Sequence, residues 1–137
     1  YLAPKGRVYQ AGTLSGNPLA VAAALAILEQ LTPEVYTRWE EIGRTVEEDF
    51  LIPATKRGLS FHRVGSMWTL FFREEAPNDF AGVQQCDMTR FAEFFQAALK
   101  HGIYLPASQY EAIFLSALMT KEDTEQLVSG LQKSLLS

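Results

Sequence analysis

Two glycines and two hydroxyl side chains stand just before a predicted helix, in the segment Tyr9–Pro18, YQAGTLSGNP. Asn17 followed by Pro18 is typical of a helix N-cap and first helical position, where exposed N–H groups and the positive end of the helix dipole meet. Such a terminus favours an anion, and Thr13 and Ser15 could add hydroxyl donors. The residues alone leave two interpretations open, a phosphate site and an ordinary glycine-rich helix cap. The segment lacks the Gly-Lys-Ser/Thr ending of a Walker loop and the preceding strand of a Rossmann fingerprint.

Other residue types that often do chemistry have no matching partners in the sequence. The two histidines, His62 and His101, are isolated, and we interpret them as surface or structurally satisfied residues. The single cysteine, Cys86, cannot form an internal disulfide, which favours a reducing compartment. No histidine lies near it in the sequence, so it forms no pattern of metal ligands. Acidic residues at 40–41 and 47–49 fit the solvated face of a helix. We therefore predict no metal site.

Hydrophobic periodicity predicts the elements that must position these residues. The helix from Pro18 to about Leu31 is apolar almost all round, which indicates burial on every side. A chain of this size cannot easily surround such a helix, so we expect further chain or another subunit to cover it. Three more helices are predicted: one from Pro33 that Pro53 kinks or ends, one from Asp87 to Gly102, and one that begins with a Thr120–Asp123 capping box. Short strands are predicted at Leu59–Arg63, Met67–Phe72, Ile103–Leu105 and Ile113–Ala117, and a polar loop at 73–86.

This order of elements predicts an α+β fold, with a small mixed or antiparallel sheet covered by helices and preceded by a long apolar helix. We divide it into residues 1–31, a phosphate-binding loop and interface helix, and residues 32–137, a small C-terminal α+β domain. The 137 residues are 47% hydrophobic and 20% charged, which favours a folded chain. A net charge of −4 without a basic stretch gives no support to nucleic-acid or anionic-membrane binding. The most apolar stretch, Leu19–Leu28, is far shorter than a membrane span.

Three segments carry a resemblance to a known family. Residues 9–26, YQAGTLSGNPLAVAAALA, resemble the segment of class III aminotransferase-like pyridoxal-phosphate enzymes that opens their interface helix. The YQAGT lead-in is similar to the glutamate-1-semialdehyde aminomutase branch, as is the segment 94–116, FFQAALKHGIYLPASQYEAIFLS. Between them, Val64–Met67 resembles the Val-Gly-Gly/Ser-Met turn of that branch. The resemblance implies the C-terminal part of a fold type I pyridoxal-phosphate enzyme.

The resemblance also implies roles for individual residues. Thr13 is expected to bind the cofactor phosphate through its hydroxyl and backbone N–H, with Gly12 beside it, in the active site of a neighbouring subunit. Tyr9 is expected to line that shared site. Glu111 matches a family carboxylate near the substrate and the site entrance, whereas the residues alone favour a plain surface glutamate. Met119 stands where the family often has a histidine, so the resemblance assigns no role to this position.

The lysine that would form a Schiff base with pyridoxal phosphate has no convincing candidate among the five lysines of the chain. Each of these lysines lies near a predicted helix end, near a glycine turn, or in the proline- and glycine-containing segment at the beginning of the sequence. The resemblance places the reactive lysine, and the aspartate that binds the pyridinium, before Tyr1. We therefore expect no catalytic residue in this chain and no activity from the chain alone.

The implied reaction is that of an isomerase, which moves an amino group within one molecule. Glutamate 1-semialdehyde, (S)-4-amino-5-oxopentanoate, becomes 5-aminolevulinate for tetrapyrrole (porphyrin) biosynthesis, with the pyridoxamine form of the cofactor in the cycle. The implied setting is a cytoplasmic homodimer with a small-molecule substrate. Two alternatives remain, another class III enzyme of the ω-aminotransferase type and a non-catalytic module that dimerises through its apolar helix.

Overall fold

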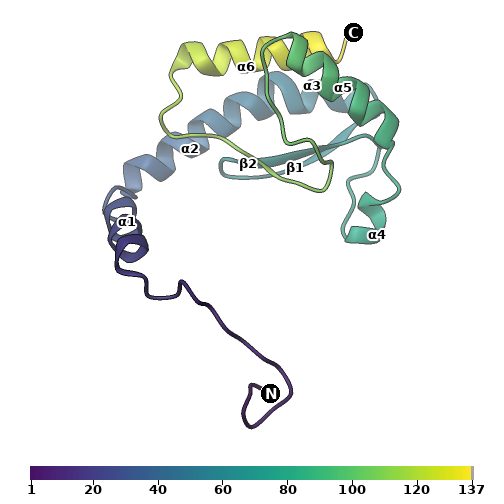
Figure 1. Ribbon diagram of the computed structural model, residues 1–137. Coiled ribbons are helices and arrows are strands. Elements are labelled where there is room, and N and C mark those ends of the chain that lie inside the picture. The colour runs from purple at the N-terminus through teal and green to yellow at the C-terminus, as the bar shows by residue number, and fades with distance from the viewer. Residues whose placement is uncertain (137) are drawn as a thin grey trace. The chain divides into compact units, whose positions relative to one another are not determined.

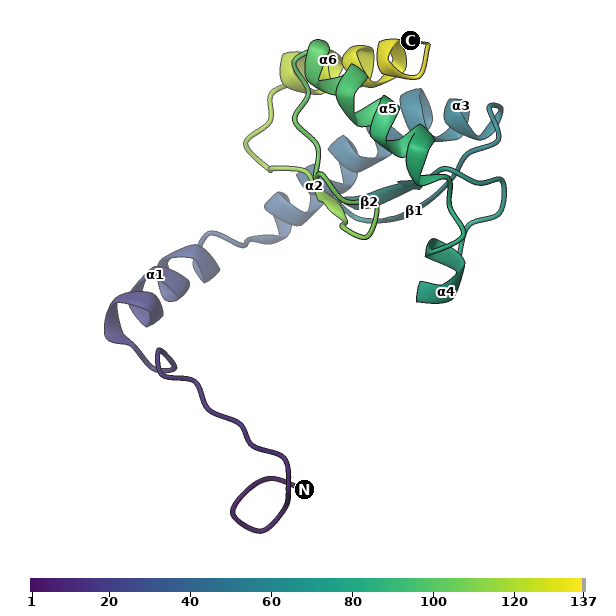
Figure 2. The same ribbon diagram turned by 45° about the vertical axis from the view of Figure 1, so that its right-hand side comes forward.

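The structure, a computed structural model, describes residues 1–136. The chain divides into two units, Tyr1–Thr32 and a second unit that begins at Pro33. Figure 1 and Figure 2 show the elements of each unit.

The first unit contains one helix, α1 (Pro18–Leu28), and its start follows from the local sequence. The side chain of Asn17 accepts hydrogen bonds from the N–H groups of Leu19 and Ala20, at 3.1 Å each, and Pro18 has no N–H to satisfy. The helix ends three residues before the predicted Leu31. Gln30 and Leu31 donate to carbonyls three residues back instead, which tightens the chain into a turn.

Helix α1 presents apolar side chains to solvent. None of its residues is buried within the described part of the chain, and Leu19 is 80% exposed. A helix with no polar face needs a cover on all sides, as the sequence predicts, and its own unit, Tyr1–Thr32, does not provide one.

The second unit contains a three-stranded antiparallel sheet in the order β1-β2-β3. Strand β1 (Ser60–Val64) and strand β2 (Met67–Phe71) pair across the turn at Gly65, whose φ of 57° suits a glycine. Strand β3 pairs with the start of β2 and has only two residues, Ile113–Phe114. The antiparallel sheet with helices confirms the predicted α+β fold.

Helices lie over one face of this sheet (Figure 1). Helix α2 (Pro33–Val46) continues through a π-helical turn, Glu47–Leu51, into α3 (Ile52–Thr55). Pro53 therefore stands in the first turn of α3 and does not end the helical run. The carbonyl of Asp49, four residues before it, accepts a hydrogen bond from Gln132 Nε2 at 2.8 Å instead of from a backbone N–H of position 53. Helix α5 (Met88–Lys100) begins at the Asp87 cap and α6 (Lys121–Ser134) at the Thr120–Asp123 capping box, both as predicted.

The core between sheet and helices is built around aromatic rings. Phe50 of the π-helical turn meets the Trp68 ring edge-on at a centroid distance of 6.0 Å and stacks on Phe94 at 6.3 Å. All three side chains are at least 95% buried. Burial of rings this large is a main source of stability for a unit of about a hundred residues.

Three predicted segments differ from the structure. Residues Ile103–Leu105 form no strand, because Ile103 N–H closes the end of α5 on Ala98 O and the segment then runs over the core without a strand partner. The strand predicted to Ala117 stops at Phe114, after which Leu115 N–H donates to Ser66 O outside the ladder. The loop 73–86 contains a short helix, α4 (Phe80–Val83), capped by Asp79.

An arginine fork joins the sheet to α2. The Arg63 guanidinium contacts Glu40 at 2.9 Å and Glu47 at 2.5 Å, and it also donates to Gly65 O at 2.7 Å. The hydrogen bond from Arg63 lowers the pKa of the Glu40 carboxyl below its usual value. Gly43 of α2 lies so close to this turn that an added Cβ would overlap the carbonyl oxygen of Gly65. The ion pairs of Arg63 and the close approach at Gly43 together hold the β1–β2 turn against α2.

Gly43→Ala is therefore expected to destabilise the folded protein although alanine favours helices. The added methyl group meets backbone, so α2 and the turn must move apart, at a cost of about 1–3 kcal/mol. The thermal unfolding midpoint of the full-length protein measures the effect. Arg44→Ala, the exposed neighbour on α2, is the control, and equal midpoints for the two variants would contradict the close packing.

Candidate functional site

The loop that precedes α1 consists of two successive turns. Ser15 N–H donates to Gly12 O at 3.0 Å, and Asn17 N–H donates to Leu14 O at 3.1 Å. Gly16 connects them with a φ of 75°. An added Cβ on Gly12 would overlap the present position of the Ser15 hydroxyl, so a larger residue at position 12 would require that side chain to rotate away.

The groups that this loop offers to an anion differ from those expected at a helix terminus. The first N–H groups of α1 already donate to the Asn17 side chain, and the next, of Val21, donates to Asn17 O. Within residues 1–136, neither the N–H nor the hydroxyl of Thr13 has a hydrogen-bond partner, and Thr13 is exposed. Any anion held here would be bound by Thr13 and the adjacent backbone, with the helix dipole in support.

Tyr9 lies on the same exposed loop and is 82% exposed. The first unit thus carries Tyr9, Gly12 and Thr13 together on one exposed segment.

Glu111 belongs to the second unit, on the loop between α5 and β3. Its backbone is held, because Glu111 N–H donates to Ser108 O at 3.2 Å, while its side chain is exposed. No ion pair to this carboxylate is found among residues 1–136. The carboxylate is therefore available to a cationic group.

Gln109 anchors the loop of Glu111, and sequence analysis missed it. Its side chain is only 4% exposed, and its amide Nε2 donates to Leu70 O on β2 at 2.5 Å. A glutamine inside a predicted loop gives no periodic signal, so only its position between Pro106 and a predicted strand could have drawn attention to it.

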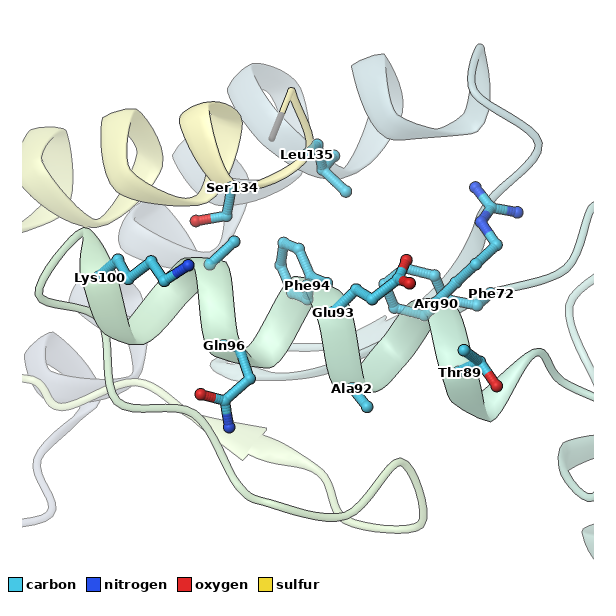
Figure 3. A pocket seen from close by; sticks show the side chains of 11 residues that line it. Phe72, Thr89, Arg90, Ala92, Glu93, Phe94, Gln96, Lys100, Ser134 and Leu135 are labelled. Carbon is cyan, nitrogen blue, oxygen red and sulfur yellow. The ribbon is translucent and has the colours of Figure 1, made fainter.

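A surface groove lies between α5 and the end of α6 (Figure 3). Arg90 leans over the ring of Phe72, at 5.7 Å from its centroid, and Glu93 and Lys100 project from the same helix. None of the predicted site residues lines this groove. Its open shape and mixed charges fit an ordinary helix surface.

The remaining titratable residues have structural surroundings. His62 Nε2 lies 2.9 Å from Pro77 O, and its ring meets Phe71 edge-on. Met119 packs against the core, and its carbonyl accepts a hydrogen bond from Arg38 at 2.6 Å. In the described part of the chain no three acidic, histidine or cysteine side chains gather as a metal site. All five lysines are exposed: Lys5, Lys56, Lys100, Lys121 and Lys133.

Hydropathy gives no membrane span within a single helix of residues 1–136. Helix α1 and the helical segment Pro33–Thr55 are long and apolar enough for a span only when taken together, as a pair with a break between them.

The fold is that of transaminases that use pyridoxal phosphate. A transaminase solved with PLP bound matches 97% of this chain and 31% of its own, with a TM-score of 0.74 and 19% identity. An omega-transaminase from Sphaerobacter thermophilus gives a TM-score of 0.78 over 98% of this chain and 32% of its own, at 19% identity. A glutamate-1-semialdehyde-aminomutase from Pseudomonas aeruginosa PAO1 gives 0.77 over 96% of this chain and 31% of its own, at 22% identity.

Sequence comparison with curated proteins identifies one family within this class of transaminases. No protein-family model matches the chain. The glutamate-1-semialdehyde 2,1-aminomutase of Sorangium cellulosum is 47% identical over 136 residues, 98% of this chain. Aminomutase 2 of Bacillus pumilus is 44% identical over 96% of it. The chain belongs to the glutamate-1-semialdehyde 2,1-aminomutase family and corresponds to the C-terminal part of its members. It spans about 31% of the length of these curated relatives.

Cys86 is expected to react slowly with thiol reagents. Burial raises the pKa of its thiol, and the side chain is 6% exposed, so both thiolate fraction and access are low. At pH 8 its modification in the native full-length protein should be at least about tenfold slower than in denaturant. Mass spectrometry of the peptide that contains Cys86 measures this. Equal rates in both states would contradict the burial.

Proposed function

We propose that the full-length protein is a pyridoxal-phosphate-dependent aminomutase that converts glutamate 1-semialdehyde to 5-aminolevulinate in tetrapyrrole biosynthesis. The observation that carries this is the 44–48% identity to curated aminomutases over at least 94% of the chain. The proposed setting is a cytoplasmic homodimer whose active sites are shared between subunits. The exposed apolar surface of α1 supports such a dimer, because it needs a cover.

The loop before α1 suits the phosphate of the proposed cofactor. The hydroxyl and N–H of Thr13 have no protein partner within residues 1–136, and Thr13 lies inside the turn that the Ser15 N–H closes on Gly12 O. When bound, pyridoxal phosphate supplies an electron sink and carries the amino group. Thr13 and Gly12 hold its phosphate in the neighbouring subunit, and Tyr9 lines that site. The lysine that binds the cofactor is supplied by the rest of the protein.

Glu111 has the role of a carboxylate at the site entrance. Its exposed side chain attracts an ammonium group of the substrate or of the diamino intermediate. The backbone of its loop is fixed at Ser108 and, through Gln109, on β2. This fixed backbone keeps the charge in one region as substrate enters.

An ω-aminotransferase is the second candidate, because an omega-transaminase matches this fold as well as an aminomutase does. The purified full-length protein distinguishes the two. We expect glutamate 1-semialdehyde to yield 5-aminolevulinate over many turnovers with no other amino donor or acceptor present. A requirement for a separate keto acid in every turnover would contradict the aminomutase function.

Thr13→Val should weaken cofactor binding. The substitution keeps the shape and removes a hydroxyl that bonds to a charged phosphate, so the Kd for pyridoxal phosphate in the full-length protein should rise about 10- to 100-fold. Thr13→Ser keeps the hydroxyl and should stay close to the parent. Titration followed by cofactor absorbance measures both, and equal Kd values for the two variants would contradict the phosphate grip.

Glu111→Gln should lower kcat/KM for glutamate 1-semialdehyde by about two- to tenfold, because an exposed charge pair contributes modestly. The loss should appear mainly in KM and shrink as ionic strength rises, since salt screens an exposed charge. Glu93→Gln, on the exposed face of α5, is the matched control. A KM unchanged by Glu111→Gln would remove Glu111 from the site entrance.

A further inference from the structure

A small cavity lies between β2, α5 and the loop that carries Glu111. Its volume is about 10 Å³. Apolar side chains form much of its wall, among them Leu70, Phe94 and Leu105, and Trp68 and Gln109 complete it. A space of this size holds one water molecule if polar partners are available.

Two buried polar atoms belong to residues in the wall of this cavity. Trp68 is 1% exposed and Gln109 4% exposed, and neither Trp68 Nε1 nor Gln109 Oε1 has a hydrogen-bond partner among residues 1–136. Because Gln109 Nε2 donates to Leu70 O, the amide orientation is fixed and Oε1 must be the free acceptor. The indole N–H is a donor only. The residues that line the cavity therefore include one with an unmatched donor and one with an unmatched acceptor.

We propose that a single buried water molecule occupies this cavity, accepts a hydrogen bond from Trp68 Nε1 and donates one to Gln109 Oε1. Water is the smallest molecule that satisfies both atoms at once. Thr69 and Ser108, which also line the cavity, carry hydroxyl groups that can complete its coordination.

The water makes Gln109 a positioning residue. Through Nε2 it holds the Glu111 loop on the β2 backbone, and through Oε1 and the water it holds the same loop on a core tryptophan. The positioning role rests on the proposed function of Glu111, whereas the water site does not.

A crystal structure of the full-length protein, at a resolution that defines buried waters, tests the site directly. We expect one ordered water within hydrogen-bond distance of Trp68 Nε1 and Gln109 Oε1. In Trp68→Phe, which keeps the ring and loses the donor, that water should be lost or reduced in occupancy while the Gln109–Leu70 bond remains. An empty cavity, or a direct protein partner for Trp68 Nε1, would overturn the proposal.

Gln109→Met in the full-length protein tests the positioning role. Methionine keeps the length and apolar volume but removes both hydrogen bonds, so backbone amides at 107–112 should exchange with solvent at least about tenfold faster. KM for glutamate 1-semialdehyde should rise with little change in kcat. Gln96→Met, on the exposed face of α5, is the matched control and should change neither.

The two readouts separate the two parts of the inference. Unchanged amide exchange in Gln109→Met would overturn the anchoring of the loop. Faster exchange with an unchanged KM would support the anchor and overturn the role of Gln109 in placing Glu111.

Discussion

Helix α1 carries apolar side chains on every face, and no residue of it is buried within the described part of the chain. Burying one leucine or isoleucine side chain contributes about 1.5–3 kcal/mol, so a helix of this composition is stable only when something covers it. The loop with Gly12 and Thr13 leads directly into this helix, and its geometry depends on the helix being formed. Whatever covers α1 therefore also fixes the proposed phosphate grip, which links assembly of the protein to cofactor binding.

The second unit depends on different contacts. An aromatic core and the Arg63 fork hold sheet and helices together, and the 106–112 loop is attached to that rigid body through Gln109. A carboxylate at a site entrance needs a fixed backbone and a side chain in water, and Glu111 has both. The two units thus offer two kinds of group: the proposed phosphate-binding residues on an exposed loop and a carboxylate on an anchored loop.

Much of the fold could be predicted from local signals. Asn17-Pro18, Asp87 and the Thr120–Asp123 pair each mark a helix start through side-chain bonds to the first N–H groups, and those bonds are present. Segments that depend on distant contacts were predicted less well. Ile103–Leu105 has the composition of a strand, but no strand lies beside it; Ile103 instead fills the space left by Gly130 of α6. Gln109 owes its importance to Leu70, 39 residues away, which no sequence pattern shows. The proposed roles of Thr13 and Glu111 come from family resemblance, because the residues alone favour an ordinary helix cap and a surface glutamate.

A mixed dimer tests whether this chain supplies Thr13 to the active site of its neighbour, as we propose. One subunit carries Thr13→Asp, whose charge repels the phosphate, and the other lacks the Schiff-base lysine that we assign to the rest of the protein. If Thr13 acts across the interface, one of the two sites combines an intact lysine with an intact Thr13, and the mixed dimer should recover about half of the parent activity. If Thr13 acts within its own subunit, both sites remain defective. A mixed dimer as inactive as the two variant homodimers would therefore show that Thr13 does not act across the interface.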